Sequence, residues 1–344
     1  MKKLLRKIRK QKNLPPPSAR ITSETVAHHR ERILAGGRRF KYPVQYARHK
    51  LVINAIAISV VTFIIVLILG WWQLYPAQNS SEFMYRIARV LPVPVANIDS
   101  QPVLYSDYLL KYRSSIHYLE QKEQVSFKSD DGKRQVEYIK QQSMRDAIAD
   151  AYAIKLAKNM GITISDSELE GFLKNQRQSS DGEISQQTYD AVILDYYGWS
   201  PAEYHHVTEN KLLRQKVSYT MDKKAIKATD SVLAALKKDP NLNFKTFATV
   251  VASQTSVKAV YGTSGWVPKN NQDGGLSTEA VKLNKLQASK PIKSTIGDGY
   301  YVIRLLDIND AQVSYEYIKV PLTAFTESLD KVIKENKVKK YISV

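Results

Sequence analysis

The chain has 344 residues, 43% of them hydrophobic, and a formal net charge of +18. This length and composition exclude a wholly disordered or collagen-like chain and allow more than one folded unit with a buried core. Because the sequence contains no cysteine, disulfides, thiolate catalysis and zinc ribbons are excluded, and the compartment stays open.

Most of the net charge lies in the first fifty residues. Residues 1–50 hold 15 Lys and Arg against only Glu24 and Glu31, which accounts for +13 of the +18. Nucleic-acid binding is one interpretation of such a basic tail. The segment that follows favours another, in which the tail stays in the cytoplasm and contacts anionic lipid, and no nucleic acid is expected as a partner. Pro15–Pro17 and Gly36-Gly37 argue against a packed fold in this tail.

An uncharged apolar segment follows, from Leu51 to Trp72. About 20 apolar residues span a bilayer core, whereas the apolar part of a secretory signal is shorter. We therefore predict a single transmembrane helix over residues 51–73. The basic excess before it, and Trp71, Trp72 and Tyr75 at its other end, predict a single-pass cell-membrane protein with a cytoplasmic N-terminus and an extracytoplasmic C-terminal bulk.

The chain after this segment is predicted to be mostly helical. It begins with a linker over residues 74–90 and an extended segment up to Ile98, because Pro92 and Pro94 disfavour helix. Apolar periodicity and terminating glycines then indicate a helical domain over residues 91–226. Its helices are expected over about residues 107–124, 135–160, 166–178, 186–197 and 201–221.

Capping signals mark several of these helix starts. Ser106 is the expected N-cap of the first helix. Ser165 with Glu168 forms a capping-box pattern, and Ser200, followed by a proline and by Glu203, is a second start signal. These signals place helix starts near residues 107, 166 and 201.

From residue 227 the pattern changes to α+β. The sequence predicts two helices and four strands, over residues 229–238, 244–252, 261–268, 292–295, 300–308 and 312–320. Gly297-Asp298-Gly299 is a hairpin signal between the second and third of these strands. A last helix is expected over residues 322–340. The predicted fold class is therefore mainly α with an α+β second part.

The order of these parts resembles the membrane-anchored SurA/PrsA-type foldases. Val95–Tyr108 is similar to the opening of the SurA N-terminal module, and Tyr196–Arg214 is similar to its last helix. Asn243–Ala248, Tyr261–Val267 and Pro291–Ile303 are similar to segments of a parvulin (PpiC-type) prolyl isomerase domain. The resemblance implies a SurA-like chaperone module over 91–226, a small parvulin-like antiparallel sheet with helices over 227–320, and a C-terminal helix within 321–344 that packs back on the helical module.

The parvulin-like part departs from the family pattern at the residues that carry its chemistry. Tyr301 stands where the last strand normally has a histidine, and Gln254 and Thr255 stand where an aspartate or cysteine is expected. No strand with the family's other histidine precedes residue 229. The resemblance therefore implies a degenerate, binding-only domain with no cofactor and no metal. If the protein is an enzyme, the resemblance implies a parvulin-type peptidyl-prolyl cis-trans isomerase.

The missing first strand has a candidate substitute on the C-terminal side. Tyr317-Ile318-Lys319-Val320 lines up with the family's His-Ile-Leu-Val stretch, again with tyrosine for histidine. A hairpin is predicted to lay residues 313–320 antiparallel against 300–308, so that Tyr301 and Tyr317 meet in the middle of the sheet. The alternative is that 312–320 is only an edge strand and that the last helix is loose. If the hairpin forms, the last helix is predicted to pack back on the helical module and to bury Leu329, Val332 and Ile333.

Other residues have both a functional and a structural interpretation. Trp199 and Trp266 are predicted core anchors rather than ligand platforms. The adjacent pairs His28-His29 and His205-His206 are predicted surface histidines rather than metal ligands, because neighbours on a helix face different directions. Four tyrosines are candidates for a polypeptide-binding groove, although core and rim packing explains them equally well: Tyr105, Tyr108, Tyr112 and Tyr118.

Three functions remain open at this point. The leading hypothesis is a membrane-tethered extracytoplasmic chaperone that binds unfolded or secreted polypeptides through apolar and aromatic surfaces. The second is an active parvulin-type isomerase, and the third is an adaptor of the cell envelope that binds one folded partner. A proline-limited refolding assay separates the second from the first, and aggregation suppression with unrelated clients separates the first from the third.

Overall fold

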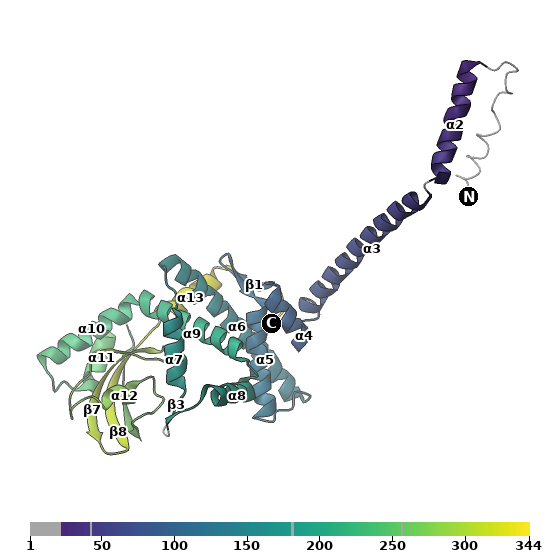
Figure 1. The fold of residues 1–344 in the computed structure, drawn as a ribbon. Coiled ribbons are helices and arrows are strands. Elements are labelled where there is room, and N and C mark those ends of the chain that lie inside the picture. Colours follow the sequence, from purple (N-terminus) through teal and green to yellow (C-terminus); the bar gives the residue numbers. More distant parts are fainter. Residues whose placement is uncertain (1–21, 42, 180–181, 256) are drawn as a thin grey trace. The chain divides into compact units, whose positions relative to one another are not determined.

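The computed structural model describes residues 22–41, 43–179, 182–255 and 257–344. The chain divides into two compact units, residues 1–72 and 73–344. As predicted, the fold is mainly α, and antiparallel sheets occur in the second unit (Figure 1).

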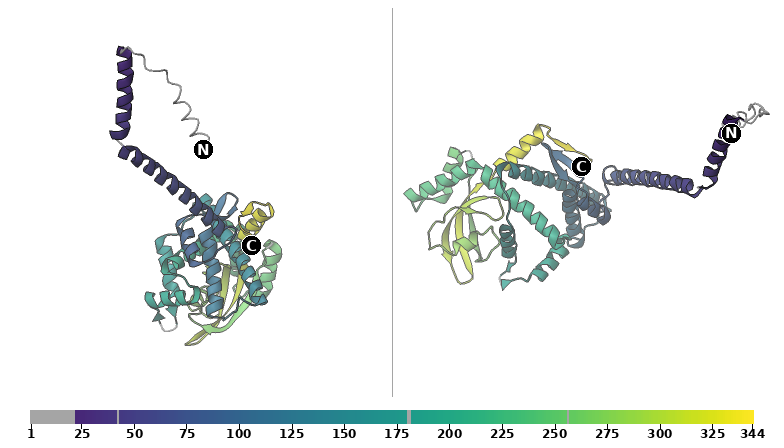
Figure 2. Two further views of the ribbon diagram at one scale, coloured as in Figure 1. Left: turned by 90° about the vertical axis from the view of Figure 1, so that its right-hand side faces the viewer. Right: turned by 45° about the horizontal axis from the view of Figure 1, so that its top comes forward.

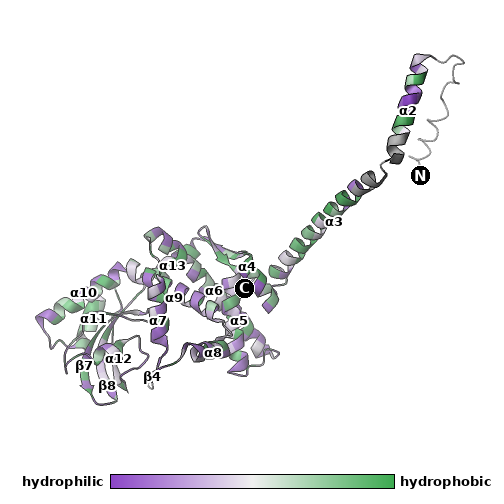
Figure 3. Ribbon diagram, in the orientation of Figure 1, coloured by the Kyte–Doolittle hydropathy of each residue, from purple (hydrophilic) through white to green (hydrophobic). Residues whose placement is uncertain are grey.

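The described part of the first unit consists of helices. α2 (Ser23–Lys41) runs through Gly36-Gly37, so these glycines do not end the helix. Its described side chains are exposed, as in a helix with no packing partner in its own unit. α3 (Pro43–Leu74) contains an apolar span, His49–Leu74, long enough to cross a membrane. Figure 3 shows this helix coloured hydrophobic along most of its length. The prolines of the tail lie outside the described residues.

Six helices form most of residues 73–221. They are α4 (Glu82–Val90), α5 (Tyr105–Gln121), α6 (Asp130–Met160), α7 (Asp166–Gln176), α8 (Gln186–Tyr197) and α9 (Pro201–Met221). The capping boxes at Ser165–Glu168 and Ser200–Glu203 are both present, and they set the starts of α7 and α9 as predicted. A short hairpin, β3 (Gln178–Ser179) with β4 (Gly182–Glu183), lies between α7 and α8.

Two expectations about helix starts are corrected. The predicted linker contains α4, whose Ser81 N-cap accepts a hydrogen bond from the Met84 amide and whose inner face is buried. α5 begins at Tyr105, with Leu104 at its N-cap, so Ser106 lies inside the helix and does not cap it. The helix starts earlier because Tyr105 is held in the core, which decides its position more strongly than a serine cap does.

A three-stranded sheet brings the beginning and the end of the second unit together. β1 (Pro94–Ile98) pairs with β2 (Gln101–Leu104) on one edge and with β9 (Val338–Lys340) on the other, both antiparallel. The predicted final helix is therefore too long, because α13 (Ala324–Lys334) stops and the chain turns at Asn336 in the left-handed region before it enters β9. A free edge on β1 gives these last residues backbone partners that no local pattern reveals.

The hydrophobic core of this region draws on both ends of the chain. It contains residues from Leu74 to Ala157, and also Phe325, Val332 and Ile342 from the C-terminal segment. α13 packs beside α9, which Figure 2 shows as the yellow helix lying against the blue and teal ones. We call residues 73–221 together with 322–344 the helical module. Of the three side chains predicted to be buried on α13, Val332 is buried and Leu329 partly buried, whereas Ile333 is 43% exposed.

The remaining residues, 223–321, form what we call the sheet domain. Its elements are α10 (Lys223–Lys238), α11 (Phe244–Thr255), β5 (Val260–Pro268), α12 (Leu276–Ala280), β6 (Ile292–Lys293), β7 (Gly299–Ile308) and β8 (Gln312–Pro321). The strand order is β5-β8-β7-β6, and all neighbours are antiparallel. Register pairs such as Ile303 with Tyr317 confirm the predicted hairpin and place β8 in the middle of the sheet, which excludes the edge-strand alternative.

The two faces of this sheet have different cores, because successive side chains of a strand point to opposite sides. One face carries Tyr300, Val302 and Ile318, and α10 and α11 cover it. The other face carries Tyr301 and Ile303, and α12 covers it. The helices thus lie on both sides of the sheet, with the pair α10–α11 on one side (Figure 1).

A buried carboxylate joins the helical module to the sheet domain. Asp222 follows α9, and its Oδ1 accepts a hydrogen bond from the Ala225 amide at 2.9 Å, which caps α10. Its Oδ2 accepts from the Thr323 and Ala324 amides at 2.7 and 3.0 Å, at the start of α13. One side chain therefore fixes the point where the chain leaves the module and the point where it returns.

α9 makes a second connection through the loop before β7. The Tyr219 hydroxyl donates to the carbonyls of Ser294 and Gly299, at 3.0 and 2.7 Å. The Gln215 side chain lies against Gly297, where an added Cβ would come within 2.4 Å of it. This contact and the positive φ of 84° both require glycine at that position.

Candidate functional site

A cavity of about 490 Å³ lies between α5, α6, α8 and α9 of the helical module. This size is in the range of sites that hold several side chains of a ligand. The residues around it are mostly apolar or aromatic in character, with polar groups at intervals. They are Lys111, Ser114, Ser115, Tyr118, Leu119, Gln135, Tyr138, Ile139, Gln142, Asp146, Tyr197, Trp199 and Val207.

Aromatic rings stacked at the α8–α9 junction form one wall of the cavity. The ring of Trp199 stacks on Tyr197 at 4.8 Å between centroids and on Tyr204 at 6.4 Å, with interplanar angles of 20° and 22°. The Tyr204 hydroxyl lies 3.0 Å from that of Tyr189 on α8. Stacked rings are stiff and offer large apolar surfaces, so this wall is a preformed contact area. The prediction that Trp199 anchors the core is correct in part, because the side chain also lines the cavity.

α8, which borders the cavity, exposes further apolar side chains. Ile193 points into the module, whereas Val192, Leu194 and Tyr196 are exposed. The Lys122 ammonium lies 4.7 Å from the centre of the Tyr196 ring, and this cation–π contact holds the ring in place. Val192 and Tyr196 lie on one side of the helix and Leu194 on another, so these exposed apolar side chains flank the helix on two sides.

The four tyrosines proposed from the sequence do not form one groove. Tyr105 and Tyr108 are buried in the core, where burial raises the pKa of both hydroxyls. Tyr105 donates to the Leu74 carbonyl at 2.6 Å, and Tyr112 stacks on Tyr108. Only Tyr118, among these four, lines the cavity. The missed signal is the run from Tyr196 to Trp199, which places two aromatic residues at the end of α8 and one in the loop before α9.

In the sheet domain the hairpin brings Tyr301 and Tyr317 together as predicted, with ring centroids 5.5 Å apart. The Tyr301 hydroxyl donates to Oδ2 of Asp298 at 2.7 Å, and the Lys319 ammonium donates to the same oxygen at 2.6 Å. Burial and the neighbouring carboxylate raise the pKa of Tyr301. Burial opposes the charge on Asp298, but the hydrogen bonds from Lys319 and Tyr301 outweigh it and lower the pKa of that carboxyl. At neutral pH the pair is therefore a neutral phenol and an ionised carboxylate.

Gln254 and Thr255, the other two positions that depart from the parvulin pattern, do not lie beside Tyr301 and Tyr317. Gln254 is exposed at the end of α11, and the Thr255 hydroxyl donates to the Val251 carbonyl at 2.7 Å. α11 packs on the face of Tyr300, whereas Tyr301 and Tyr317 belong to the opposite face. The alternation of side chains along the strands separates the two sets.

The tyrosine rings also occupy the space above the central strands. The ring of Tyr317 lies directly over Gly262 of β5, where an added Cβ would be 2.4 Å from its Cζ. Tyr301 is only 8% exposed. An amide that entered this position would have to displace both rings.

Comparison with known protein families identifies the family to which the helical module is related. A model of the SurA-like N-terminal domain matches residues 45–218. The chain belongs to this family. No curated protein and no solved structure matches the chain. SurA-like domains bind polypeptides in general, and the match covers every helix that borders the cavity but ends before the sheet domain.

The remaining sequence candidates are the histidine pair on α9 and Trp266 on β5. His206 is hydrogen bonded to Asp107 at 2.8 Å, which raises the pKa of its imidazole, and His205 lies 3.9 Å from Glu170. Across the described ranges, no group of three or more His, Asp or Glu side chains is arranged to hold a metal ion. Trp266 is 49% exposed on β5, so the prediction that it anchors the core is wrong.

Proposed function

We propose that the protein is a membrane-tethered extracytoplasmic chaperone that holds unfolded or secreted polypeptides on its SurA-like domain. The observation that carries this proposal is the apolar, aromatic cavity between α5, α6, α8 and α9. Unfolded chains differ from folded proteins in exposing apolar side chains, and rigid aromatic walls bind such side chains without requiring a particular sequence.

The charge distribution supports the membrane part of the proposal. The basic excess before the apolar span of α3 favours a cytoplasmic N-terminus, which places residues beyond Tyr75 outside the cytoplasm. The basic tail then contacts anionic lipid on the cytoplasmic side. Protease added to intact cells or right-side-out vesicles should digest the second unit and spare the tail. Protection of the second unit would refute this orientation.

The sheet domain serves in this proposal as a binding or spacing element without isomerase activity. Its central strands carry tyrosines in the positions where the parvulin-like resemblance places histidines, and these rings fill the face above them. The alternative of an active isomerase therefore has less structural support than the chaperone. The adaptor alternative expects one folded partner, whereas a chaperone binds several unrelated clients. The next experiment distinguishes the two by testing several clients.

Suppression of client aggregation by the reconstituted full chain tests the proposal. Tyr138→Ser combined with Leu194→Ser removes two exposed apolar side chains at the cavity and on α8. The matched control is Trp266→Ser with Val260→Ser, which removes an aromatic and an aliphatic side chain of similar exposure from β5. We expect the first pair to lose most of the suppression for several unrelated clients and the control to keep it.

Two outcomes would contradict the proposal. Equal loss in both pairs would show that the cavity is not the binding site. Suppression of a single client, with none for others, would favour an adaptor with one folded partner. Because all four residues are on the surface, circular dichroism should show unchanged thermal unfolding, which separates loss of binding from loss of fold.

A further inference from the structure

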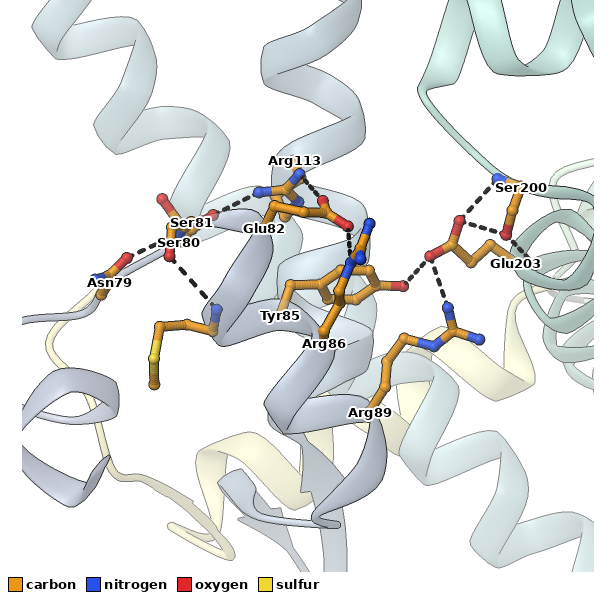
Figure 4. A network of polar contacts seen from close by, with 11 residues as sticks. Asn79, Ser80, Ser81, Glu82, Tyr85, Arg86, Arg89, Arg113, Ser200 and Glu203 are labelled. Atoms are coloured by element: carbon orange, nitrogen blue, oxygen red, sulfur yellow. Dashed lines mark hydrogen bonds and ion pairs between the residues drawn. The ribbon is translucent and has the colours of Figure 1, made fainter. Parts of the chain in front are cut away.

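One face of α4 is locked onto the helical module by a polar network (Figure 4). The Tyr85 hydroxyl donates to Oε1 of Glu203 at 2.6 Å, and Arg89 bonds the same oxygen at 3.1 Å. Arg113 of α5 donates to the Ser80 carbonyl at 2.8 Å and pairs with Glu82. The orientation of this short helix on the module is therefore fixed.

The side of α4 that points away from its buried residues, such as Met84 and Ala88, carries exposed apolar side chains. Phe83 is 70% exposed and Val90 is 80% exposed, and they lie seven residues apart, on one side of the helix. Arg86 lies between them on the same side, and its ion pair with Glu82 is exposed, so it holds the guanidinium only weakly. Leu91, which follows the helix, is also exposed. We call Phe83, Arg86, Val90 and Leu91 the α4 stripe.

The α4 stripe lies close in sequence to the apolar span of α3. Leu74, the last residue of that helix, is buried in the core of the module, and its carbonyl accepts the Tyr105 hydroxyl. The Asn79 amide donates to the Gln73 carbonyl at 2.9 Å, which closes the chain into a turn directly afterwards. Leu74 and the turn after it therefore belong to the packed helical module, and Phe83 follows only nine residues after Leu74.

A second exposed segment, Lys339–Tyr341, contacts Tyr75, the residue that follows the end of α3. The ring of Tyr341 packs edge-on against Tyr75, with centroids 6.5 Å apart. The Tyr341 amide donates to the Val95 carbonyl at 2.9 Å, which continues the pairing of β9 with β1. Lys339 and Lys340 precede it and are exposed. Tyrosine and lysine are the residue types that favour the headgroup zone of a membrane.

We propose that the α4 stripe, together with Lys339, Lys340 and Tyr341, docks the helical module on the anionic headgroups of the leaflet in which α3 ends. This inference rests on the membrane anchoring proposed above. The apolar side chains enter the boundary between headgroups and acyl chains, as in other amphipathic interfacial helices, and the basic side chains contact lipid phosphates. The module is then held in one orientation against the membrane.

Site-specific fluorescence tests this docking, and the cysteine-free sequence makes single labels straightforward. An environment-sensitive probe is placed at Val90→Cys in the α4 stripe, at Val260→Cys in β5 as the matched exposed control, and at Ile58→Cys inside the apolar span. The full chain is reconstituted in vesicles of phosphatidylcholine with phosphatidylglycerol, with or without spin-labelled lipid. We expect quenching at positions 90 and 58, with at least about twofold less quenching at position 260.

Charge removal sharpens the test. Lys339→Gln with Lys340→Gln should weaken docking of the Val90 probe by about fivefold per charge in anionic vesicles, and much less in pure phosphatidylcholine. The control is Lys237→Gln with Lys238→Gln, another exposed lysine pair, at the end of α10. Loss in both pairs to the same extent would show that the effect is one of net charge and would overturn the proposed surface.

The three probes separate failure of docking from failure of anchoring. Quenching at position 58 without quenching at position 90 would overturn the docking surface and leave the membrane anchor intact. Absence of quenching at position 58 would overturn both. Cross-linking between Cys side chains introduced at position 90 of two chains, without lipid quenching, would show that a second copy covers the stripe, and would also overturn the proposal.

Discussion

The helical module and the sheet domain close their cores in different ways. The module is assembled from two chain segments more than a hundred residues apart, because β9 and α13 return to β1 and α9. The sheet domain is one continuous segment between them, and its two central strands, β7 and β8, form a hairpin. The module therefore depends on a distant closure, whereas the centre of the sheet is local.

The two regions also differ in what they leave open. The SurA-like domain keeps a cavity of about 490 Å³ with aromatic walls. In the sheet domain the rings of Tyr301 and Tyr317 fill the face above the central strands, and Tyr317 lies against the backbone of Gly262. The comparison shows that the open apolar cavity belongs to the module, whereas this face of the sheet domain is packed.

Removal of residues 322–344 should have the largest effect. It takes α13 and β9 away from the helical module and exposes the backbone edge of β1 and the core around Phe325, Val332 and Ile342. We expect hydrogen exchange to become fast in β1 and α6 while β7 and β8 remain protected. Retention of protection in β1 would contradict the view that the C-terminal segment completes the module.

Asp222→Ala should have the next largest effect, because one buried carboxylate caps α10 and accepts two amides at the start of α13. We expect a loss of about 2–4 kcal/mol in the free energy of unfolding. Asp239→Ala, at the exposed opposite end of α10, should cost less than about 0.5 kcal/mol. Equal effects in urea denaturation would show that Asp222 has no special role in joining the two regions.

Local signals predicted much of this fold. The capping boxes at Ser165 and Ser200 marked helix starts that the structure confirms, because both partners of such a box lie within three residues. The alternating segment 313–320, placed directly after a strand and a turn, predicted the central hairpin for the same reason. In each case the partner is close in sequence, so a local sequence pattern is enough to predict the contact.

Long-range contacts explain what the sequence did not reveal. The last residues of the chain form β9 because β1 offers an edge, and β1 lies far away in sequence. Tyr105 and Tyr108 were candidates for a groove because their spacing fits either a core or a surface, and only packing decides between them. Trp266 is exposed for a similar reason, since its neighbours are set by the bulge between β5 and β8.

Gly262→Ala should destabilise the sheet domain by about 1–3 kcal/mol, because the new methyl group would overlap the ring of Tyr317. In a Tyr317→Val background the same substitution should cost much less, since the ring is gone. A double-mutant cycle in denaturant measures this coupling. Additive costs would show that the ring does not rest on this strand.

The pH dependence of stability should report the contact between Tyr301 and Asp298. Because hydrogen bonds lower the pKa of this carboxyl in the folded state, its stabilising contribution is present above the ordinary carboxyl pKa and is lost as pH falls through the folded value. Tyr301→Phe removes one donor, so we expect the pKa of Asp298 to rise towards its ordinary range in carboxyl NMR titrations. Tyr315→Phe, which removes a hydrogen bond to Asp273 instead, should leave Asp298 unchanged.

The smallest expected effect is on prolyl isomerisation, where we expect none. The barrier of about 18–20 kcal/mol comes from amide resonance, and an enzyme lowers it by placing the twisted amide in an apolar pocket beside suitable hydrogen bonds. Here the two rings occupy that position, and the Tyr301 hydroxyl is already bonded to Asp298. The full chain should therefore leave the cis-trans exchange rate of a Xaa-Pro peptide at its uncatalysed value. Catalysis that disappears in Tyr301→Phe would mean that the phenol has taken over a histidine's role, and the sheet domain would then be an active site rather than a packed element.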